Sequence, residues 1–145
     1  LPSALSMRQT PYGAAPAENP QRGRVAMARE DPREHALIGA AWYAGVLAHT
    51  ARGGLDAVTL AAVAGPSGVV AADGSPHPVF EVLRGHAALR GRPVRAARSS
   101  APREVQVTAV GDAVWLVNLT GRPQRVRLDG KAIELAAYAV ADLTA

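Results

Sequence analysis

The sequence is poor in several residue types, and each shortage argues against a class of function. It contains no cysteine, which excludes a disulfide framework, a thiolate nucleophile and a cysteine-ligated metal site. Aromatic residues make up only 4% of the 145 residues, and no apolar stretch is long and unbroken enough to cross a bilayer. We therefore expect a protein without disulfides and without a membrane partner.

The basic residues are almost all arginine and do not form a stripe. Lys and Arg together number 16, Lys131 is the only lysine, and the formal net charge is +4. A nucleic-acid platform needs clustered cations interleaved with stacking aromatics, so we expect no nucleic-acid partner. The chain begins at Leu1 without a signal-peptide pattern, which leads us to expect a cytoplasmic protein and a piece of a larger one.

Common cofactor and nucleophile motifs are also missing. The sequence has no dinucleotide-binding Gly-x-Gly-x-x-Gly with its acidic partner, no P-loop, no His-Glu-x-x-His and no Gly-x-Ser-x-Gly elbow. The four histidines show no metal-ligand spacing with acidic residues: His35, His49, His77 and His86. We interpret His49, late in a predicted helix, and His77, beside a proline at a helix start, as structural. No metal and no cofactor are expected.

The strongest structural signal is a helix with marked ends, followed by an apolar run. Asp31, Pro32 and Glu34 form a capping-box pattern that predicts a helix beginning at Asp31. Residues 53–54, both glycine, predict its end, because glycine adopts the left-handed backbone of a helix C-terminus at little cost. Residues 57–64 are apolar on both faces, which predicts a strand in a parallel sheet that is covered on both sides.

The same alternation of strand, loop and helix extends over residues 1–91. Residues 1–8 are typical of the end of a strand and residues 9–30 of a long loop, while Pro78 opens a second helix that Gly91 ends. This alternation predicts two successive β/α units, in which each helix returns the chain across a parallel sheet.

From residue 92 the pattern changes to the two-residue period of antiparallel strands. Asp129-Gly130 between two apolar runs is a strong two-residue hairpin signal. The pattern predicts a small antiparallel β-sandwich domain in residues 92–145, with the strand around Trp115 central and its indole in the core. The strand candidates are residues 94–98, 105–110, 114–119, 124–128 and 133–142.

Candidate substrate-binding residues lie where the predicted strands end. Glycines in residues 65–68 would let a ligand approach the backbone, although a tight turn explains the same sequence. Arg8 follows the preceding strand and would face the same pocket, where a guanidinium can bind a carboxylate or sugar oxygens, or can pair internally. The long loop after Arg8 has the composition of a binding loop or of a solvated excursion. The residues selected are Arg8, Gln9, Tyr12, Asn19, Gly65 and Ser67.

No catalytic residue can be assigned from the sequence. Glu34 is explained by capping and Glu81 by exposure on a helix, so no convincing pair of carboxylates is evident, although glycoside hydrolysis normally needs two. Asn118 and Thr120 match a glycosylation sequon, which we attribute to chance because the match lies in a strand. Trp115 and Tyr138 are the obvious aromatic candidates if the last domain binds carbohydrate.

Three strings within residues 3–91 resemble the end of the D-apionate lactonase family: SMRQTPYGAAPAENPQRGRVAMAREDPRE, AAWYAGVLAHTARGGLDAVTLAAVAGPSGVV and HPVFEVLRGHAAL. The later string VWLVNLTGRPQRVRL is similar to the closing β-domain of that family. The resemblance implies a glycoside hydrolase-like (β/α)8 barrel flanked by β-domains. It also implies hydrolysis of a sugar-derived lactone, D-apionolactone, to the open acid.

The expected fold class is therefore α/β plus β: the last two β/α units of a TIM-type barrel, followed by the β-sandwich. A full barrel needs about 250 residues, so the remainder of the barrel would lie upstream and this chain alone should be inactive. The favoured function is that of a carbohydrate-active hydrolase fragment acting on a small sugar lactone. The alternatives are a fragment of a retaining glycoside hydrolase, or a non-catalytic carbohydrate-binding or structural β-module.

Overall fold

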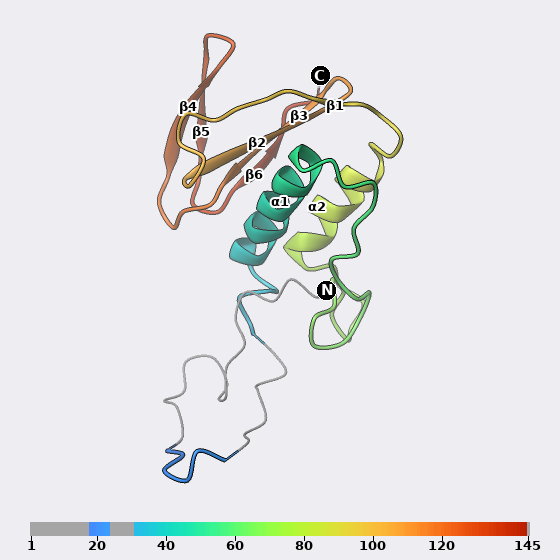
Figure 1. Cartoon of the computed structure of the whole chain (residues 1–145), viewed down its shortest axis with the longest axis vertical. Coiled ribbons are helices and arrows are strands. Elements are labelled where there is room, and N and C mark those ends of the chain that lie inside the picture. The colour runs from blue at the N-terminus through green and yellow to red at the C-terminus, as the bar shows by residue number, and fades with distance from the viewer. Residues whose placement is uncertain (1–17, 24–30, 145) are drawn as a thin grey trace.

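The computed structural model describes residues 18–23 and 31–144, whose helices and strands form three layers (Figure 1). Helices α1 (Leu37–Arg52) and α2 (Pro78–Ala87) pack on one face of a four-stranded antiparallel sheet with the order β1-β2-β3-β6. The β4-β5 hairpin packs on the other face. The strands are β1 (Val94–Arg95), β2 (Val105–Val110), β3 (Ala113–Asn118), β4 (Gln124–Leu128), β5 (Lys131–Leu135) and β6 (Val140–Asp142).

The central strands β2 and β3 are buried on both faces, because a layer covers each side of the sheet. Val117 on β3 joins the core formed with Tyr43 of α1 and Val82 of α2. Val107 and Leu116, which are cross-strand partners, face the hairpin and form a second core with Leu135. The predicted central position of the strand around Trp115 is confirmed, since β3 pairs with both β2 and β6.

The antiparallel part of the chain follows its sequence pattern closely. β2 and β4 have the predicted bounds, and β3 differs by one residue at each end. Asp129 and Gly130 have φ of 48° and 83°, the positive values that a type I′ turn requires, and Leu128 pairs with Lys131 across it. The predicted two-residue hairpin is confirmed.

Two strand predictions in this region are wrong in extent. The stretch 133–142 divides into β5 and β6, because Tyr138 adopts a left-handed backbone with φ of 56° and the Ala139 N–H donates to the Ala136 carbonyl at 3.1 Å. This turn takes the chain from the hairpin to the four-stranded sheet. The stretch 94–98 is a strand only over the two residues of β1.

The first helix begins later than the capping-box pattern predicts. α1 starts at Leu37, and its N-cap is Ala36, which makes no side-chain capping bond. Residues 31–36 instead form tight turns, in which the Glu34 N–H donates to the Asp31 carbonyl at 2.9 Å. The Asp31 carboxylate accepts hydrogen bonds from the Arg33 guanidinium and the Arg33 N–H, so it caps this turn rather than α1.

The predicted ends of both helices are close to those observed. Gly54 follows α1 with φ of 71°, and Gly91 closes the turn after α2 with φ of 78°. α2 begins at Pro78, as its sequence predicts. In both cases a glycine supplies the left-handed residue that lets the chain leave the helix.

The predicted strand at residues 57–64 is wrong for the chain as described. This stretch is irregular and unpaired, apart from a single parallel bridge between Ala62 and Gly68. Leu60 is buried, whereas Val63 is 75% exposed. A strand requires a neighbouring strand for its hydrogen bonds, and no described strand lies beside this stretch.

The helical layer is joined to the sheet by a buried polar contact. Arg52 at the end of α1 donates through Nη2 to the Gln106 Oε1 on β2 at 2.8 Å. The alternating pattern put Gln106 on the opposite face of its strand from Val105, and that face is buried against α1 with Gln106 only 1% exposed. The guanidinium satisfies an amide that would otherwise be costly to bury.

A second junction is formed by His86 on α2 and Trp115 on β3. Their ring centroids are 4.4 Å apart, and the His86 Nδ1 lies 2.9 Å from the Val82 carbonyl oxygen. A carbonyl can only accept, so Nδ1 carries a proton and Nε2 is the site that a second proton would occupy. Nε2 is buried without a hydrogen-bond partner in the described structure, and burial lowers the pKa of His86 against the opposing effect of the Val82 carbonyl.

We expect the free energy of unfolding to decrease as the pH falls below about 6.5, the ordinary pKa of histidine. The unfolded chain then binds a proton at His86 that the folded chain resists, at a cost of at most about 1.4 kcal/mol per pH unit for one group. Urea unfolding at pH 7.5 and at pH 5.5 measures the loss, and His86→Phe should reduce it. An equal loss in the wild type and His86→Phe would contradict this assignment.

Candidate functional site

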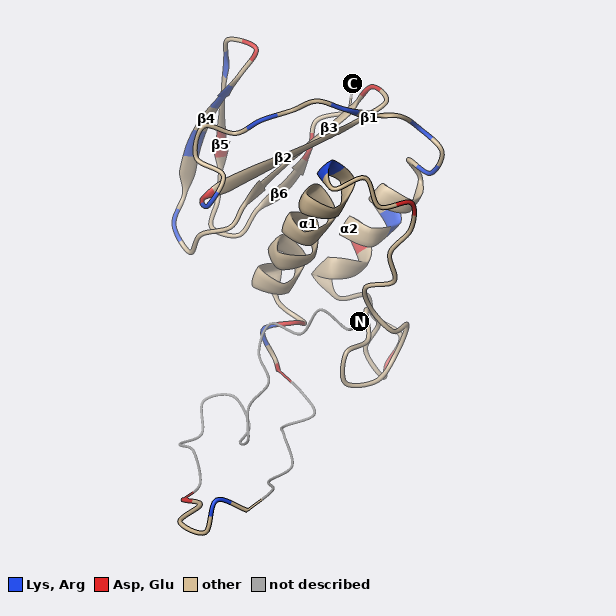
Figure 2. Cartoon of the chain, viewed as in Figure 1, with Lys and Arg blue, Asp and Glu red and all other residues tan. Residues whose placement is uncertain are grey.

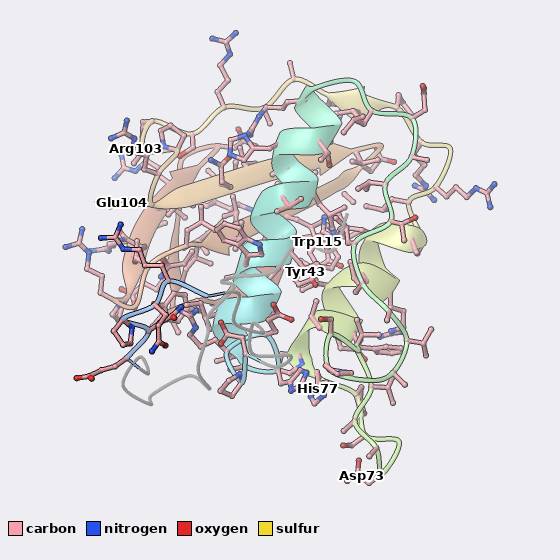
Figure 3. All side chains as sticks on the ribbon, turned by 60° about the horizontal axis from the view of Figure 1, so that its bottom comes forward. Tyr43, Asp73, His77, Arg103, Glu104 and Trp115 are labelled. Carbon is pink, nitrogen blue, oxygen red and sulfur yellow. The ribbon has the colours of Figure 1, made fainter. Side chains whose placement is uncertain are left out.

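Both helices begin at the same end of the molecule, and the loops that precede them lie side by side there. We call residues 31–36 and 65–77 the helix-start edge. Figure 3 shows His77 beside the start of α2 and Asp73 at the tip of the loop before it. In β/α architecture the loops that lead into the helices follow the carboxyl ends of the strands.

The closest contact across this edge is a stack of two imidazoles. The rings of His35 and His77 have centroids 4.0 Å apart and an interplanar angle of 5°. The His35 Nε2 is buried and has no hydrogen-bond partner in the described structure. Burial lowers the pKa of His77, the neighbouring His35 lowers it further, and Asp73 opposes both. His77 is therefore a neutral imidazole at neutral pH, and a neutral imidazole can accept a proton.

The loop before α2 folds back on itself and fixes the backbone of His77. The His77 N–H donates to the Val69 carbonyl at 2.9 Å, and Val70 forms a bridge with Pro76. At the tip, the Asp73 Oδ1 accepts from the Ser75 hydroxyl at 2.6 Å and from the Ser75 N–H at 2.9 Å, and these bonds lower the pKa of Asp73. His77 is thus held beside residues 65–68.

Residues 65–68 form the tight turn that was one of the two expectations for them. The Gly68 N–H donates to the Gly65 carbonyl at 2.8 Å, and Gly65 has φ of 93°. A Cβ on Gly68 would lie 2.6 Å from the Cα of Ala64, so the close turn requires glycine there. The turn accounts for the glycines, and contact of Gly65 and Ser67 with a ligand stays a prediction.

The other predicted site residues belong to the first thirty residues. Asn19 closes a small loop: its Oδ1 accepts from the Gly23 N–H at 3.0 Å, and its Nδ2 donates to the Gly23 carbonyl at 2.9 Å. Both ends of this amide are used locally. Arg8, Gln9 and Tyr12 lie outside the described residues.

The acidic residues of the 31–36 turn are buried, whereas Asp73 on the other loop of the edge is exposed. Asp31 is 7% exposed and forms an ion pair with Arg33, and Glu34 is 6% exposed. From their sequence context, Asp31 and Glu34 were predicted to cap a helix and His77 to be structural, and His35 was not selected as a site residue. The sequence did contain one signal that could have pointed to this pair: a histidine lies near the start of each of the two predicted helices.

Two clefts lie beside the helices, and neither is lined by His35 or His77. One of about 720 Å³ lies against the last turns of both helices and residues 55–61, and another of about 360 Å³ lies between α2 and β6. Trp115 and Tyr138 line the second cleft, but Trp115 is only 9% exposed and belongs to the core as predicted. Its indole therefore offers little surface on which a sugar could stack.

The part of the chain that the structure describes offers no clustered basic surface (Figure 2). Basic residues are spread over β4, the chain around β1 and the helix ends, without a continuous stripe (Figure 2). No group of three or more His, Asp or Glu residues is arranged to hold a metal ion there. None of the described helices is both long and apolar enough to cross a membrane.

The comparisons with known proteins decide the family. Residues 1–91, more than half of the 145, match the family described as "D-apionate lactonase, TIM barrel domain". The chain belongs to the D-apionate lactonase family. Residues 102–143 match the lactonase family's "C-terminal immunoglobulin-like domain". The expected fold class, barrel-type β/α units followed by a β-sandwich, is confirmed.

One curated relative is much longer than this chain. The D-apionate lactonase of Brucella anthropi is 36% identical over 149 residues, which cover 98% of this chain and 24% of that protein. The chain thus spans about a quarter of the length of this curated relative. No solved structure matches the chain. In TIM barrels, active sites lie at the ends of the strands from which the loops lead into the helices.

Proposed function

We propose that this chain forms the closing part of an enzyme that hydrolyses a small sugar-derived lactone, such as D-apionolactone, to its open acid. The support is the match of residues 1–91 to the lactonase barrel family, together with the curated relative's name. The helix-start edge would be this chain's share of the substrate site. The division into residues 1–91 and 92–145 and a cytoplasmic location remain predictions.

Lactone hydrolysis needs a water molecule, a group that accepts its proton and donors that stabilise the oxyanion. We propose Arg8, Gln9 and Tyr12 as donors to the substrate, because they lie at or just after the end of the strand predicted for residues 1–8. Asn19 is a weaker candidate, since its amide closes its own loop. The backbone of Gly65 and the hydroxyl of Ser67 would contact the substrate from the neighbouring loop.

A chimera tests this function directly. The matched quarter of the Brucella anthropi lactonase is replaced by this chain, and lactone hydrolysis is followed by the acid released. We expect turnover in the chimera and none in the isolated chain, because the isolated chain contains only two β/α units of a barrel. Arg8→Ala in the chimera should lower kcat/KM by about 10-fold or more, as expected for a lost charge-assisted bond.

The unmodified relative provides the positive control, and a cooperative unfolding transition shows that the chimera is folded. A folded chimera that hydrolyses no lactone would contradict the proposed function. An active chimera with unchanged kcat/KM after Arg8→Ala would remove only Arg8 from the substrate site.

A further inference from the structure

His35 and His77 are well placed to move a proton, and the inference drawn from them rests on the proposed lactonase function. The two residues come from the loops that lead into successive helices, so both lie on the substrate side of a barrel-type domain. Their rings are parallel to within 5° and 4.0 Å apart. Sequence motifs did not point to this contact, which appears only when the two loops are folded together.

The two imidazoles are not equivalent. His35 is half-buried, and its Nε2 lies in the buried part without a hydrogen-bond partner in the described structure, so this nitrogen is closed to solvent. His77 is half-buried, which leaves part of its ring open to water or substrate. Two protonated rings 4.0 Å apart would repel each other, so the pair favours at most one proton.

We propose that His77 is the general base of lactone hydrolysis, and that His35 is a positioning residue that holds the His77 ring in place by stacking. The backbone of His77 is fixed on both sides: its N–H donates to Val69, and its carbonyl accepts from the Phe80 N–H at 2.8 Å. Val69 follows Ser67 by two residues. The base and the predicted substrate-binding turn therefore share one loop.

The chemical step is balanced without a further reactant. The open nitrogen of His77 accepts a proton from water as the water oxygen bonds to the lactone carbonyl carbon. The tetrahedral intermediate then breaks the bond between that carbon and the ring oxygen. The imidazolium returns its proton to the departing ring oxygen, which becomes the hydroxyl of the product acid.

Other charged groups near the pair set its response to pH. Asp73 lies on the His77 loop, and the Asp31–Arg33 ion pair and Glu34 lie on the turn that carries His35. On α2, Glu81 is paired with Arg84. The net effect is a lowered pKa for His77, so kcat should fall only when the pH drops below about 6.5, the ordinary value for histidine.

The experiment uses the chimera and measures kcat and KM against pH. His77→Ala and His77→Gln should each lower kcat by about 10²–10⁴-fold, the usual contribution of a general base, and added imidazole should restore part of the activity of His77→Ala. His35→Phe keeps a flat ring in the stack and removes the electrostatic effect by which His35 lowers the pKa of His77, so the acid limb of kcat should move to higher pH. His49→Asn, at the other end of α1, is the matched control and should leave the profile unchanged.

The possible failures are distinguishable. An inactive chimera would overturn the proposed function and this assignment with it. An active chimera whose folded His77 variants lose less than about tenfold in kcat would overturn the general base alone. An acid limb that stays in place in His35→Phe would overturn the role of His35.

Discussion

Gly39→Ala is expected to destabilise the chain by about 1–3 kcal/mol, although alanine is the better helix former by about 1 kcal/mol. Gly39 lies in the first turn of α1, directly against the tight turn of residues 31–36. An added Cβ would collide with the carbonyl oxygen of Glu34 and lie 2.7 Å from its carbonyl carbon and 2.9 Å from the Arg33 carbonyl oxygen. These are backbone atoms, so no side-chain rotation relieves the collision.

The sign of the change distinguishes this effect from helix propensity. Gly53→Ala is the matched control, because Gly53 has φ of −76° and its nearest Cβ contact would be an ordinary 3.4 Å. Urea unfolding should show a loss of stability for Gly39→Ala and none, or a small gain, for Gly53→Ala. A gain in stability for Gly39→Ala would contradict the close contact between Gly39 and the backbone of residues 33–34.

An element could be predicted from the sequence when its contacts are made within a few residues, and could not when they depend on distant parts of the chain. The Asp129-Gly130 hairpin and strands β2 and β4 were predictable, because their turns and their two-residue period are encoded within a few residues. The structure of residues 57–64 was not predictable in this way, since a strand there needs neighbouring strands that the described residues do not supply. The start of α1 was missed because the Arg33 guanidinium engages the Asp31 carboxylate and holds a separate turn.

The candidate site was less predictable than the fold. Gly65 and Ser67 were selected from the position of their loop after a predicted strand, and their contact with a ligand stays a prediction. The stack of His35 on His77 joins residues 42 positions apart through two irregular loops, and no local pattern encodes such a contact. Asp31 and Glu34 fit a capping box so well that their burial at this edge was not foreseen.

Asn118→Asp should be the most damaging single-atom change in the β-domain, with an expected loss of about 3–5 kcal/mol, the usual cost of an uncompensated buried charge. Asn118 is completely buried at the end of β3. Its Nδ2 donates to the carbonyls of Arg122 at 2.7 Å and Ala136 at 2.8 Å, and its Oδ1 accepts from the Thr120 N–H at 2.9 Å. One amide thus ties β3 to the chain entering β4 and to the chain leaving β5.

A carboxylate in this position would direct an oxygen at two carbonyl oxygens, and no donor would remain for them. Urea unfolding at pH 7 should show the full loss. The loss should be smaller near pH 4, because a protonated carboxyl can still donate one hydrogen bond. Gln124→Glu is the control: it makes the same chemical change at a less buried amide, whose Nε2 donates to the Thr120 hydroxyl at 3.1 Å and where water can replace the lost hydrogen bond. Equal losses for the two variants would contradict the view that Asn118 joins the two sheets through its donor group.

The burial of Asn118 also bears on the glycosylation sequon that begins at this residue. We attribute the sequon to chance, since the Asn118 amide is enclosed by protein once the domain has folded.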